Sequence, residues 1–282
     1  MSAIPPPFPL TYEALVRRAL REDLGRAGDL TTDALIADRH VEARIVVREA
    51  GRVAGLPVAA AAFRLLDATV AFEACTSEGC DVAPGTTLAR LRGPARPILA
   101  AERTALNFLG RLCGIATATA RAVAAVQGTR ARIACTRKTT PGLRALEKYA
   151  VRLGGGANHR FGLDDGVLIK DNHLRLAGSL AAAVERVRLR VGHMVKIEVE
   201  VDSLEQLRQA AALGVDAVLL DNFGVAELRE AVRLAEGKVL LEASGGITLE
   251  DVAQVAATGV HVISLGWLTH SAPALDVALE VT

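Results

Sequence analysis

From residue 130 onward, short apolar runs alternate with segments of helical periodicity, and no other feature constrains the fold of this chain as strongly. The apolar runs occupy 132–135, 166–170, 195–201, 216–221, 238–244 and 260–266, and helical patterns occupy 178–190, 203–213, 225–234 and 249–257. Buried strands that alternate with helices form a parallel sheet, either open or closed. The later runs recur every 20 to 25 residues, a compact spacing that favours a βα barrel over a sheet with long excursions.

The chain before residue 130 shows a different pattern. Segments between about 41 and 93 alternate in polarity or are rich in β-branched residues, and a helix is predicted near 56–66. Apolar residues recur at helical spacing over 97–126, which predicts one or two helices. After a proline-rich arm, Thr11 is a good N-cap for a short helix that runs to about Arg21. We therefore expect an α+β domain around a small antiparallel sheet.

The charge of the chain is nearly balanced, with 33 basic and 32 acidic residues. Nucleic acids and anionic membranes usually require a broad basic bias, so neither is expected as a partner. The N-terminus lacks the pattern of a signal peptide, and no apolar segment reaches the roughly 18 residues of a membrane span. The four cysteines show neither a C-x-x-C pair nor zinc-ligand spacing, which indicates structural cysteines in a reducing compartment and a cytoplasmic protein.

One segment, TRKTTPGLRALEKYAVRLGGGANHR at 136–160, concentrates cations although the chain as a whole is nearly neutral. Its basic residues are Arg137, Lys138, Arg144, Lys148, Arg152, His159 and Arg160, with Glu147 as the single acid. Such a local density of cations indicates a site for an anion. Arg144, Lys148 and Arg152 recur every fourth residue, however, and we interpret these three as a solvated helix face. His159 follows three glycines, which favours a site residue over a structural histidine.

Polar or glycine-rich residues stand at the ends of the apolar runs. They are Thr136-Arg137-Lys138, Lys170-Asp171-Asn172-His173, Asp221-Asn222, Ser244-Gly245-Gly246 and Ser264-Leu265-Gly266, and the third run carries Glu198 and Glu200. The carboxyl ends of parallel strands meet on one face, where α/β proteins place functional side chains. The alternative is that these residues merely terminate the strands, since every strand ends at something polar.

Two of these groups have both an ordinary and a functional interpretation. Glu198 and Glu200 share one strand face, so they are either solvated acids or inward acids that need a metal or a cation. Ser244, Gly245 and Gly246 form either a plain turn or a nest of backbone amides for phosphate, which late strands of βα barrels commonly provide.

Several motifs of other enzyme classes are absent. The sequence contains no G-x-G-x-x-G, no G-x-x-x-x-G-K-[ST], no H-E-x-x-H and no G-x-S-x-G. The remaining cations, acids and glycine-rich strand ends suit a multiply anionic substrate, a phosphate and a divalent metal. Such a site positions charge and contains no evident covalent catalyst.

The motifs TRKTTPG, GGG-x-NHR and IKDNH occur in this order, followed by KIEVEV, LLDNF, EASGGI and ISLG. Together they resemble the quinolinate phosphoribosyltransferase family. EDLGRAGDLTTDALI (22–36) and ERTALNFLGRLCGIAT (102–117) resemble N-terminal motifs of the same family, so the resemblance spans nearly the whole chain. The departures are small: Gly110 and Cys113 stand where Gln and Ser are expected, and Ala157 where a larger residue is common.

The resemblance implies a fold and an activity. The expected fold is an N-terminal α/β sandwich at 1–112 and an incomplete barrel of six or seven strands, of the type II phosphoribosyltransferase kind, at 113–269. The tail at about 270–282 is free to return to the first domain. The implied enzyme is a homodimer that transfers the phosphoribosyl group of phosphoribosyl pyrophosphate to quinolinate with Mg²⁺, releasing pyrophosphate and CO₂ and forming nicotinate mononucleotide for NAD biosynthesis.

The family pattern implies that cations hold the dicarboxylate substrate. Arg137, Arg160 and Lys170 are expected to bind the quinolinate carboxylates. Arg103 is expected to reach the same site from the other subunit, so that each active site is shared across the dimer interface.

The pattern also implies a site for phosphoribosyl pyrophosphate. Lys138 and His159 are expected to contact pyrophosphate or ribose oxygens, and Glu200 and Asp221 to serve Mg²⁺ and the ribose hydroxyls. Ser244, Gly245, Gly246 and Gly266 are expected at the 5′-phosphate, and Ser264 is a further candidate for substrate binding. Lys138, Glu200 and Asp221 are the expected catalytic residues.

Two other functions stay open. The chain could be a related phosphoribosyltransferase or pyrophosphorylase that acts on another base, against which the set of Arg137, Arg160 and Lys170 argues. It could also be a non-catalytic barrel that binds anions, against which Glu200 and Asp221 argue, because a pure anion receptor has no use for inward acids.

Overall fold

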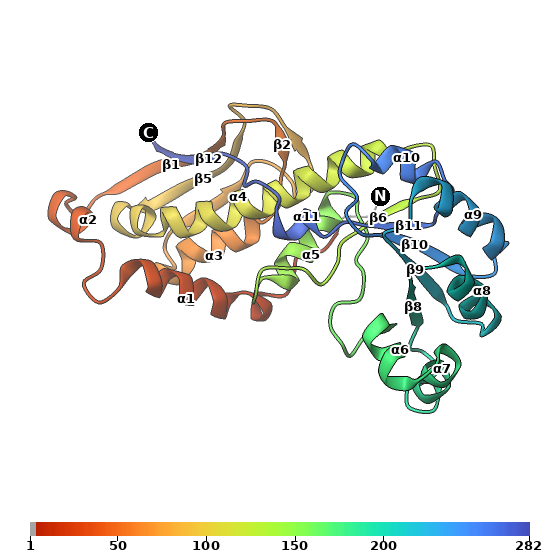
Figure 1. Ribbon diagram of the computed structural model, residues 1–282. Coiled ribbons are helices and arrows are strands. Elements are labelled where there is room, and N and C mark those ends of the chain that lie inside the picture. The colour runs from red at the N-terminus through yellow and green to blue at the C-terminus, as the bar shows by residue number, and fades with distance from the viewer. Residues whose placement is uncertain (1–3) are drawn as a thin grey trace. The chain divides into compact units, whose positions relative to one another are not determined.

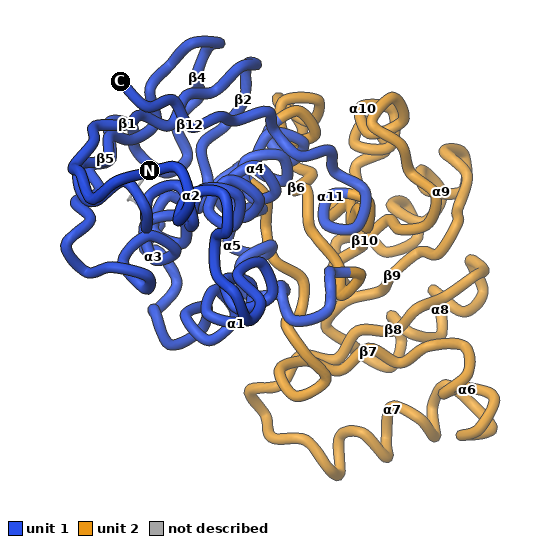
Figure 2. Tube along the Cα trace, turned by 90° about the vertical axis from the view of Figure 1, so that its left-hand side faces the viewer, with its two compact units in different colours: residues 1–120, 139–155, 268–282 blue, residues 121–138, 156–267 orange. Residues whose placement is uncertain are grey.

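The computed structural model describes residues 4–282 of the chain. These residues form two compact units, coloured separately in Figure 2. Unit 1 contains residues up to 120 together with 139–155 and 268–282, and unit 2 contains 121–138 and 156–267.

Unit 1 contains the antiparallel sheet that the sequence predicts. Its strands are β1 (His40–Val47), β3 (Ala71–Ala74), β5 (Thr87–Pro94) and β12 (Val277–Val281), in the order β12-β1-β5-β3 (Figure 1). A separate pair is formed by β2 (Gly51–Arg52) and β4 (Asp81–Val82). The last strand of the chain, β12, pairs with β1 from Ala43↔Val281 to Val47↔Val277. The segment after residue 270 therefore belongs to the same sheet as the first strand.

The helices of unit 1 pack around this sheet. They are the short η1 (Pro9–Thr11), α1 (Glu13–Leu24), α2 (Leu30–Leu35), α3 (Leu56–Leu66), α5 (Arg144–Leu153) and α11 (Trp267–His270), the last of which begins in unit 2. A single helix, α4 (Ala95–Ala125), occupies the region where one or two helices were predicted, and it continues into unit 2.

The predicted N-cap at Thr11 is wrong by one residue. Thr11 ends the short helix η1, where its hydroxyl donates to the carbonyl oxygen of Phe8, and Tyr12 is the N-cap of α1. The Thr11 hydroxyl is thus used by the preceding turn. Tyr12 is 2% exposed, so packing of its ring sets the start of the helix.

The two departures from the family pattern on α4 have structural reasons. The Gly110 carbonyl accepts from the backbone N–H of Leu275, and a Cβ at Gly110 would lie 2.9 Å from the Leu275 carbonyl oxygen. The Cys113 thiol accepts from the N–H of Ala54 at 3.2 Å and donates to the carbonyl oxygen of the same residue at 3.3 Å. A serine hydroxyl could make the same two bonds. Burial raises the pKa of the Cys113 thiol to about 12, so the group stays protonated.

The prediction of a solvated face on helix α5 is wrong. Lys148 is only 2% exposed and Glu147 is fully buried, whereas Arg152 is exposed. Almost every residue from Leu146 to Leu153 is buried, and Glu147 is in contact with Arg111 of α4 and with Thr140. Basic residues at every fourth position therefore do not mark a solvent face in this helix.

Unit 2 is an incomplete βα barrel. Its six parallel strands are β6 (Arg132–Ala134), β7 (Val167–Ile169), β8 (Ile197–Val201), β9 (Ala217–Asp221), β10 (Leu240–Ser244) and β11 (Val262–Ser264). The strand order is β6-β11-β10-β9-β8-β7, so the barrel is open between β6 and β7. On the free edge of β6, Ala157 forms an isolated parallel bridge with Ala134 and supplies a fragment of a further strand.

Helices follow the strands of unit 2 and cover the outside of the sheet. They are α6 (Asp171–Ala177), α7 (Leu180–Arg188), α8 (Leu204–Ala212), α9 (Val225–Ala235) and α10 (Val252–Ala256). Helices α8 and α9 lie against each other and beside strands β8 to β10 (Figure 1). Every predicted strand and helix of this region is present. Among the described residues, no helix is long and apolar enough to cross a membrane.

Candidate active site

The register of the parallel strands places the predicted acids on one face of the sheet. Glu200 pairs with Leu219, and Ser244 pairs with Asp221. Because side chains alternate between faces, Asp221 shares the face of Leu219, and therefore the face of Glu200. Glu242 also pairs with Leu219 and joins this group. Acids from three neighbouring strands thus point the same way, toward the interior of the barrel.

Lys170 and Glu200 form an ion pair at the carboxyl ends of β7 and β8. The Lys170 Nζ lies 3.0 Å from Glu200 Oε2, and the Glu200 side chain is 17% exposed. Lys170 is also the N-cap of helix α6, where its backbone N–H donates to His173 Nδ1. Glu200 therefore has Lys170 as the cationic partner that an inward-facing acid needs.

Asp221 ends strand β9, and the next residue, Asn222, has a left-handed backbone conformation that is uncommon for residues other than glycine. Asn222 has φ of 58° and donates through Nδ2 to Asp221 Oδ2 at 2.8 Å. Its backbone N–H donates to the Ser244 carbonyl oxygen on the next strand. This geometry fixes the Asp221 carboxylate at the strand end, beside Ser244.

The glycines after β10 are required by their surroundings. Gly245 has φ of 99°, and a Cβ there would collide with the Asn222 side chain. Gly246 has φ of 60° and faces open space. The indole N–H of Trp267 donates to the Ile247 carbonyl oxygen, which joins this loop to the one that contains Gly266. Two glycine-rich strand ends are therefore held together, an arrangement that suits an anion.

Two guanidinium groups belong to segments at the open edge of the barrel, one after β6 and one before β7. Arg137 follows β6, and Arg160 lies in an irregular segment before β7, where its Nη1 donates to the Gly166 carbonyl oxygen at 2.9 Å. Burial lowers the pKa of Arg160, and the positive charge of Arg137 lowers it further. Repulsion of this kind requires like charges at close range. A bound anion between the two groups would relieve it. Lys138 follows Arg137 directly, and its backbone N–H donates to Thr136 Oγ1.

His159 belongs to a buried cluster with two carboxyl groups. Its Nε2 lies 2.9 Å from Glu198 Oε2 and 3.6 Å from Glu242 Oε1, and its Nδ1 accepts from the Arg160 backbone N–H at 2.7 Å. Burial, and then the charge of Glu198, raise the pKa of Glu242 to about 7, and a contact with Ser264 opposes this rise. Glu198 and Glu242 are 9% and 4% exposed.

This cluster does not fit a metal ion as it stands. A ring nitrogen that accepts an N–H bond carries no proton, so the proton of the neutral His159 ring lies on Nε2. That nitrogen donates to Glu198 and has no free lone pair for a metal. Sequence reasoning missed Glu242, although its position two residues before Ser244 places it on the inward face.

Ser264 and Arg103 lie in different surroundings from the other candidates. Ser264 is 4% exposed, next to Glu242, and among the described residues its hydroxyl has no hydrogen-bond partner of good geometry. Arg103 belongs to unit 1, on the exposed side of α4, where it lines a surface pocket together with Glu22 and Asp23.

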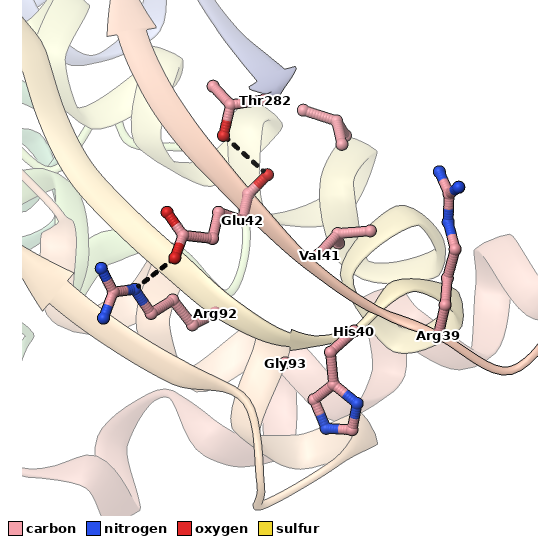
Figure 3. Close-up of a pocket in the computed structure, with 8 residues that line it drawn as sticks. Arg39, His40, Val41, Glu42, Arg92, Gly93 and Thr282 are labelled. Atoms are coloured by element: carbon pink, nitrogen blue, oxygen red, sulfur yellow. Dashed lines mark hydrogen bonds and ion pairs between the residues drawn. The ribbon is translucent and has the colours of Figure 1, made fainter.

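Another pocket of unit 1 contains none of the candidate residues. Figure 3 shows it at the end of the antiparallel sheet, where Arg39 and His40 lie near an ion pair between Arg92 and Glu42 with a distance of 3.1 Å. The side chains of that pair are 71% and 62% exposed. Exposed pairs of this kind contribute about 0–1 kcal/mol, so we interpret the pocket as ordinary surface.

Comparison with known proteins identifies the family. Residues 29–113 match the N-terminal domain of quinolinate phosphoribosyl transferase, and residues 115–280 match its C-terminal domain. A probable nicotinate-nucleotide pyrophosphorylase (carboxylating) of Bacillus subtilis is 45% identical over 97% of this chain and 94% of its own length. The human nicotinate-nucleotide pyrophosphorylase (carboxylating) is 41% identical over 97% of this chain and 92% of its own length.

Solved structures agree with the sequence comparison. The nicotinate-nucleotide pyrophosphorylase of Francisella tularensis superposes with a TM-score of 0.94 at 39% identity, covering 99% of this chain and 98% of that one. NadC of Streptococcus pyogenes superposes with a TM-score of 0.95 at 37% identity, covering 99% of both chains. The motifs, the barrel and these matches agree, and the chain belongs to the quinolinate phosphoribosyltransferase family.

Proposed function

We propose that this chain is a pentosyltransferase that transfers the phosphoribosyl group of phosphoribosyl pyrophosphate to quinolinate. The products are nicotinate mononucleotide, pyrophosphate and CO₂, and the reaction supplies NAD biosynthesis. The family membership of the whole chain supports this activity. Within the structure, one observation carries it: Lys170 and Glu200 form an ion pair at the carboxyl ends of β7 and β8, on the face that also holds Asp221.

The cations near these strand ends suit the two carboxylates of quinolinate. In our proposal Arg137, Arg160 and Lys170 bind these carboxylates through charge-assisted hydrogen bonds, which contribute about 1.5–3 kcal/mol each. Lys170 is already paired with Glu200, so it can exchange one carboxylate for another without becoming an isolated charge. The repulsion between Arg137 and Arg160 favours occupation of the site by a dianion.

The chemistry requires no protein nucleophile. The pyridine nitrogen has its own lone pair and attacks the ribose C1 as the bond to pyrophosphate breaks. Catalysis then consists of alignment and of stabilisation of the leaving group and of an oxocarbenium-like transition state. The product is a pyridinium, and its positive nitrogen stabilises the electron pair left on the adjacent carbon when CO₂ departs. A proton from solvent then completes the nicotinate ring.

We assign the phosphoribosyl pyrophosphate to the loops after β6, β10 and β11. In our proposal Lys138 contacts the pyrophosphate, and the amides of Gly245 and Gly246 bind the 5′-phosphate together with Gly266; the positive φ angles of the two glycines and the Trp267 bond that holds their loop support this. Both ring nitrogens of His159 are engaged with protein groups.

Glu200 and Asp221 fit Mg²⁺ as ligands, directly or through water. They offer hard carboxylate oxygens from neighbouring strands on one face, which is the donor type that Mg²⁺ prefers. A bound Mg²⁺ would neutralise negative charge on the pyrophosphate. The protein itself holds the two carboxylates in place through Lys170 and Asn222.

We further propose a homodimer in the cytoplasm. Arg103 is exposed on α4 and lies beside a pocket, so it is available to a partner subunit. Cys75 and Cys80 are free and exposed, which is usual for proteins kept in a reducing compartment.

The test is a comparison of two substrates. The purified protein is incubated with phosphoribosyl pyrophosphate, Mg²⁺ and either quinolinate or nicotinate, and nicotinate mononucleotide is quantified. Nicotinate lacks the 2-carboxylate and leaves a cation without its partner, so we expect kcat/KM to fall on the order of 10²-fold or more. Comparable turnover of the two acids would contradict the proposal and favour a related enzyme with another base, and no turnover of either would favour a binding protein.

A further inference from the structure

Arg160 lies in a segment that secondary structure does not hold. Residues 158–166 form neither helix nor strand, so side-chain contacts must fix the backbone there. Asp165 accepts from the N–H groups of Phe161 and Gly162, and the Gly166 carbonyl oxygen accepts from the Arg160 guanidinium. A further contact, at the Arg160 backbone N–H, comes from the His159 ring.

The orientation of the His159 ring depends on a buried acid. The ring accepts from Arg160 through Nδ1, so its proton lies on Nε2 and is donated to Glu198 at 2.9 Å. Glu198 is located on strand β8, in the middle of the parallel sheet, and is 9% exposed. Two hydrogen bonds therefore connect a rigid strand with the irregular Arg160 segment. The first joins Glu198 to the His159 ring, and the second joins that ring to the backbone N–H of Arg160.

We propose that Glu198 is a positioning residue for quinolinate binding, which acts by fixing the His159 ring and, through it, the backbone of Arg160. This inference rests on the proposed function, in which Arg160 binds a carboxylate of quinolinate. Glu198 also attracts the Arg160 guanidinium, which opposes the repulsion from Arg137. Around metal sites, mutation of a residue that orients a metal ligand typically lowers metal affinity or activity by about 10- to 100-fold. We expect an effect of similar size on quinolinate binding when the residue that orients Arg160 is changed.

Three substitutions separate position from charge. Glu198→Gln keeps an acceptor oxygen at the same distance but removes the charge. Glu198→Asp keeps the charge but withdraws the acceptor by one methylene group. Glu198→Ala removes both. If position matters, Glu198→Gln should remain within about threefold of the wild-type KM for quinolinate, whereas Glu198→Asp and Glu198→Ala should raise it roughly tenfold or more.

The steady-state readout compares the change in KM for quinolinate with the change in KM for phosphoribosyl pyrophosphate. The KM for phosphoribosyl pyrophosphate should stay within about twofold in every variant, because the hydrogen bonds that hold the loops after β10 and β11 come from Asn222 and Trp267 rather than from His159. Glu185→Ala, at an exposed acid on α7, is the matched control and should leave both KM values unchanged. Equal rises in the two KM values, or an unchanged quinolinate KM in Glu198→Ala, would overturn the inference. So would a Glu198→Asp variant that behaves as wild type while Glu198→Gln behaves as Glu198→Ala.

A second readout does not depend on turnover. Nitrogen-15 NMR of the wild type should show His159 protonated at Nε2 alone, and Glu198→Ala should show a mixture of tautomers and faster hydrogen exchange at the Arg160 amide. An unchanged tautomer and exchange rate in Glu198→Ala would refute the positioning role. If the wild type turned over no quinolinate, the proposed function would fail, and these two signals would still decide whether Glu198 fixes the Arg160 backbone.

Discussion

At the scale of single residues, the buried Glu242 predicts a pH dependence of stability in the acidic to neutral range. Burial, and then the charge of Glu198, raise its pKa to about 7 from an ordinary value of 4.5. The folded state therefore binds a proton that the unfolded state releases, and this contribution to stability is fully present below about pH 4.5 and is lost as the pH rises through about 7. Each unit of pKa difference corresponds to about 1.4 kcal/mol.

We predict that Glu242→Gln removes this dependence. Between about pH 4.5 and 7 the free energy of unfolding of the wild type should fall relative to that of the variant, by a total on the order of 3 kcal/mol. Urea denaturation at several pH values measures this difference. Glu250→Gln, an exposed acid, is the control and should run parallel to the wild type. Parallel curves for Glu242→Gln as well would show that Glu242 is ionised in the folded protein.

Glu200 and Asp221 should matter for activity and little for folding. Each alanine variant should lose roughly 10²-fold or more in kcat, because charge stabilisation at a metal-assisted leaving group contributes several kcal/mol. Melting temperatures should stay close to that of the wild type, since strand-end acids on this face serve ligands more than packing. Glu205→Ala, at an exposed acid on α8, is the control. A variant with near-normal kcat in Mg²⁺ would disprove the assigned role.

The sequence predicts some of these residues better than others. An inward acid needs a partner, and the structure supplies the ammonium group of Lys170 for Glu200 and a ring N–H of His159 for Glu198. Glu242 was not predicted as a site residue, because the segment Glu242-Ala243-Ser244 is typical of the end of a strand. Only the register of β10 with β9 shows that Glu242 faces the interior of the barrel, as Glu200 does. Ser264 is buried beside Glu242, and the register of β11 with β10 puts it level with Ser244, so its expected contact with a substrate stays a prediction.

At the scale of elements, the ion pair between Arg111 and Glu147 connects α4 with α5. The fully buried Glu147 carboxylate accepts from the Arg111 guanidinium at 2.9 Å and from both the N–H and the hydroxyl of Thr140. Arg111 in turn donates to the carbonyl oxygens of Thr269 and Ala272. One carboxylate therefore fixes two helices, the loop at Thr140 and the chain that leads to β12.

We predict that Glu147→Ala destabilises the protein by about 3–5 kcal/mol, because it leaves a partly buried guanidinium without its counter-charge. Glu147→Gln keeps the shape and part of the hydrogen bonding and should cost less. Arg152→Ala, on the exposed side of the same helix, should change the free energy of unfolding by less than about 0.5 kcal/mol. Chemical denaturation of the three variants measures these values, and equal stability of Glu147→Ala and Arg152→Ala would contradict this account of α5.

The success of prediction also varied between elements. Local periodicity located all six strands of the barrel and the helices α7 to α10, because each buries one face in a regular way. It failed for α5, whose charged residues are buried by contacts with segments distant in the sequence. It also misplaced the start of α1 by one residue, where tertiary burial of Tyr12 prevailed over capping preference.

For the whole molecule, the open question is whether one subunit completes the active site of another. Arg103 lies on α4 in unit 1, whereas Arg137, Arg160 and Lys170 lie in unit 2. The family pattern assigns Arg103 to the site of the partner subunit. The alternative is a local role, for which Glu22 and Asp23 in the same pocket offer partners. Only the first possibility makes the dimer necessary for catalysis.

Mixed dimers separate the two possibilities. Arg103→Ala and Lys138→Ala should each be almost inactive alone, because every site lacks one of the two residues. In a heterodimer of the two, one site lacks both residues and the other lacks neither, so a statistical mixture should recover up to about a quarter of full activity. Lys138→Ala mixed with Glu200→Ala is the control, since both residues belong to the same barrel and no complete site can form. Absence of activity in the first mixture, despite demonstrated subunit exchange, would show that Arg103 does not act across the interface.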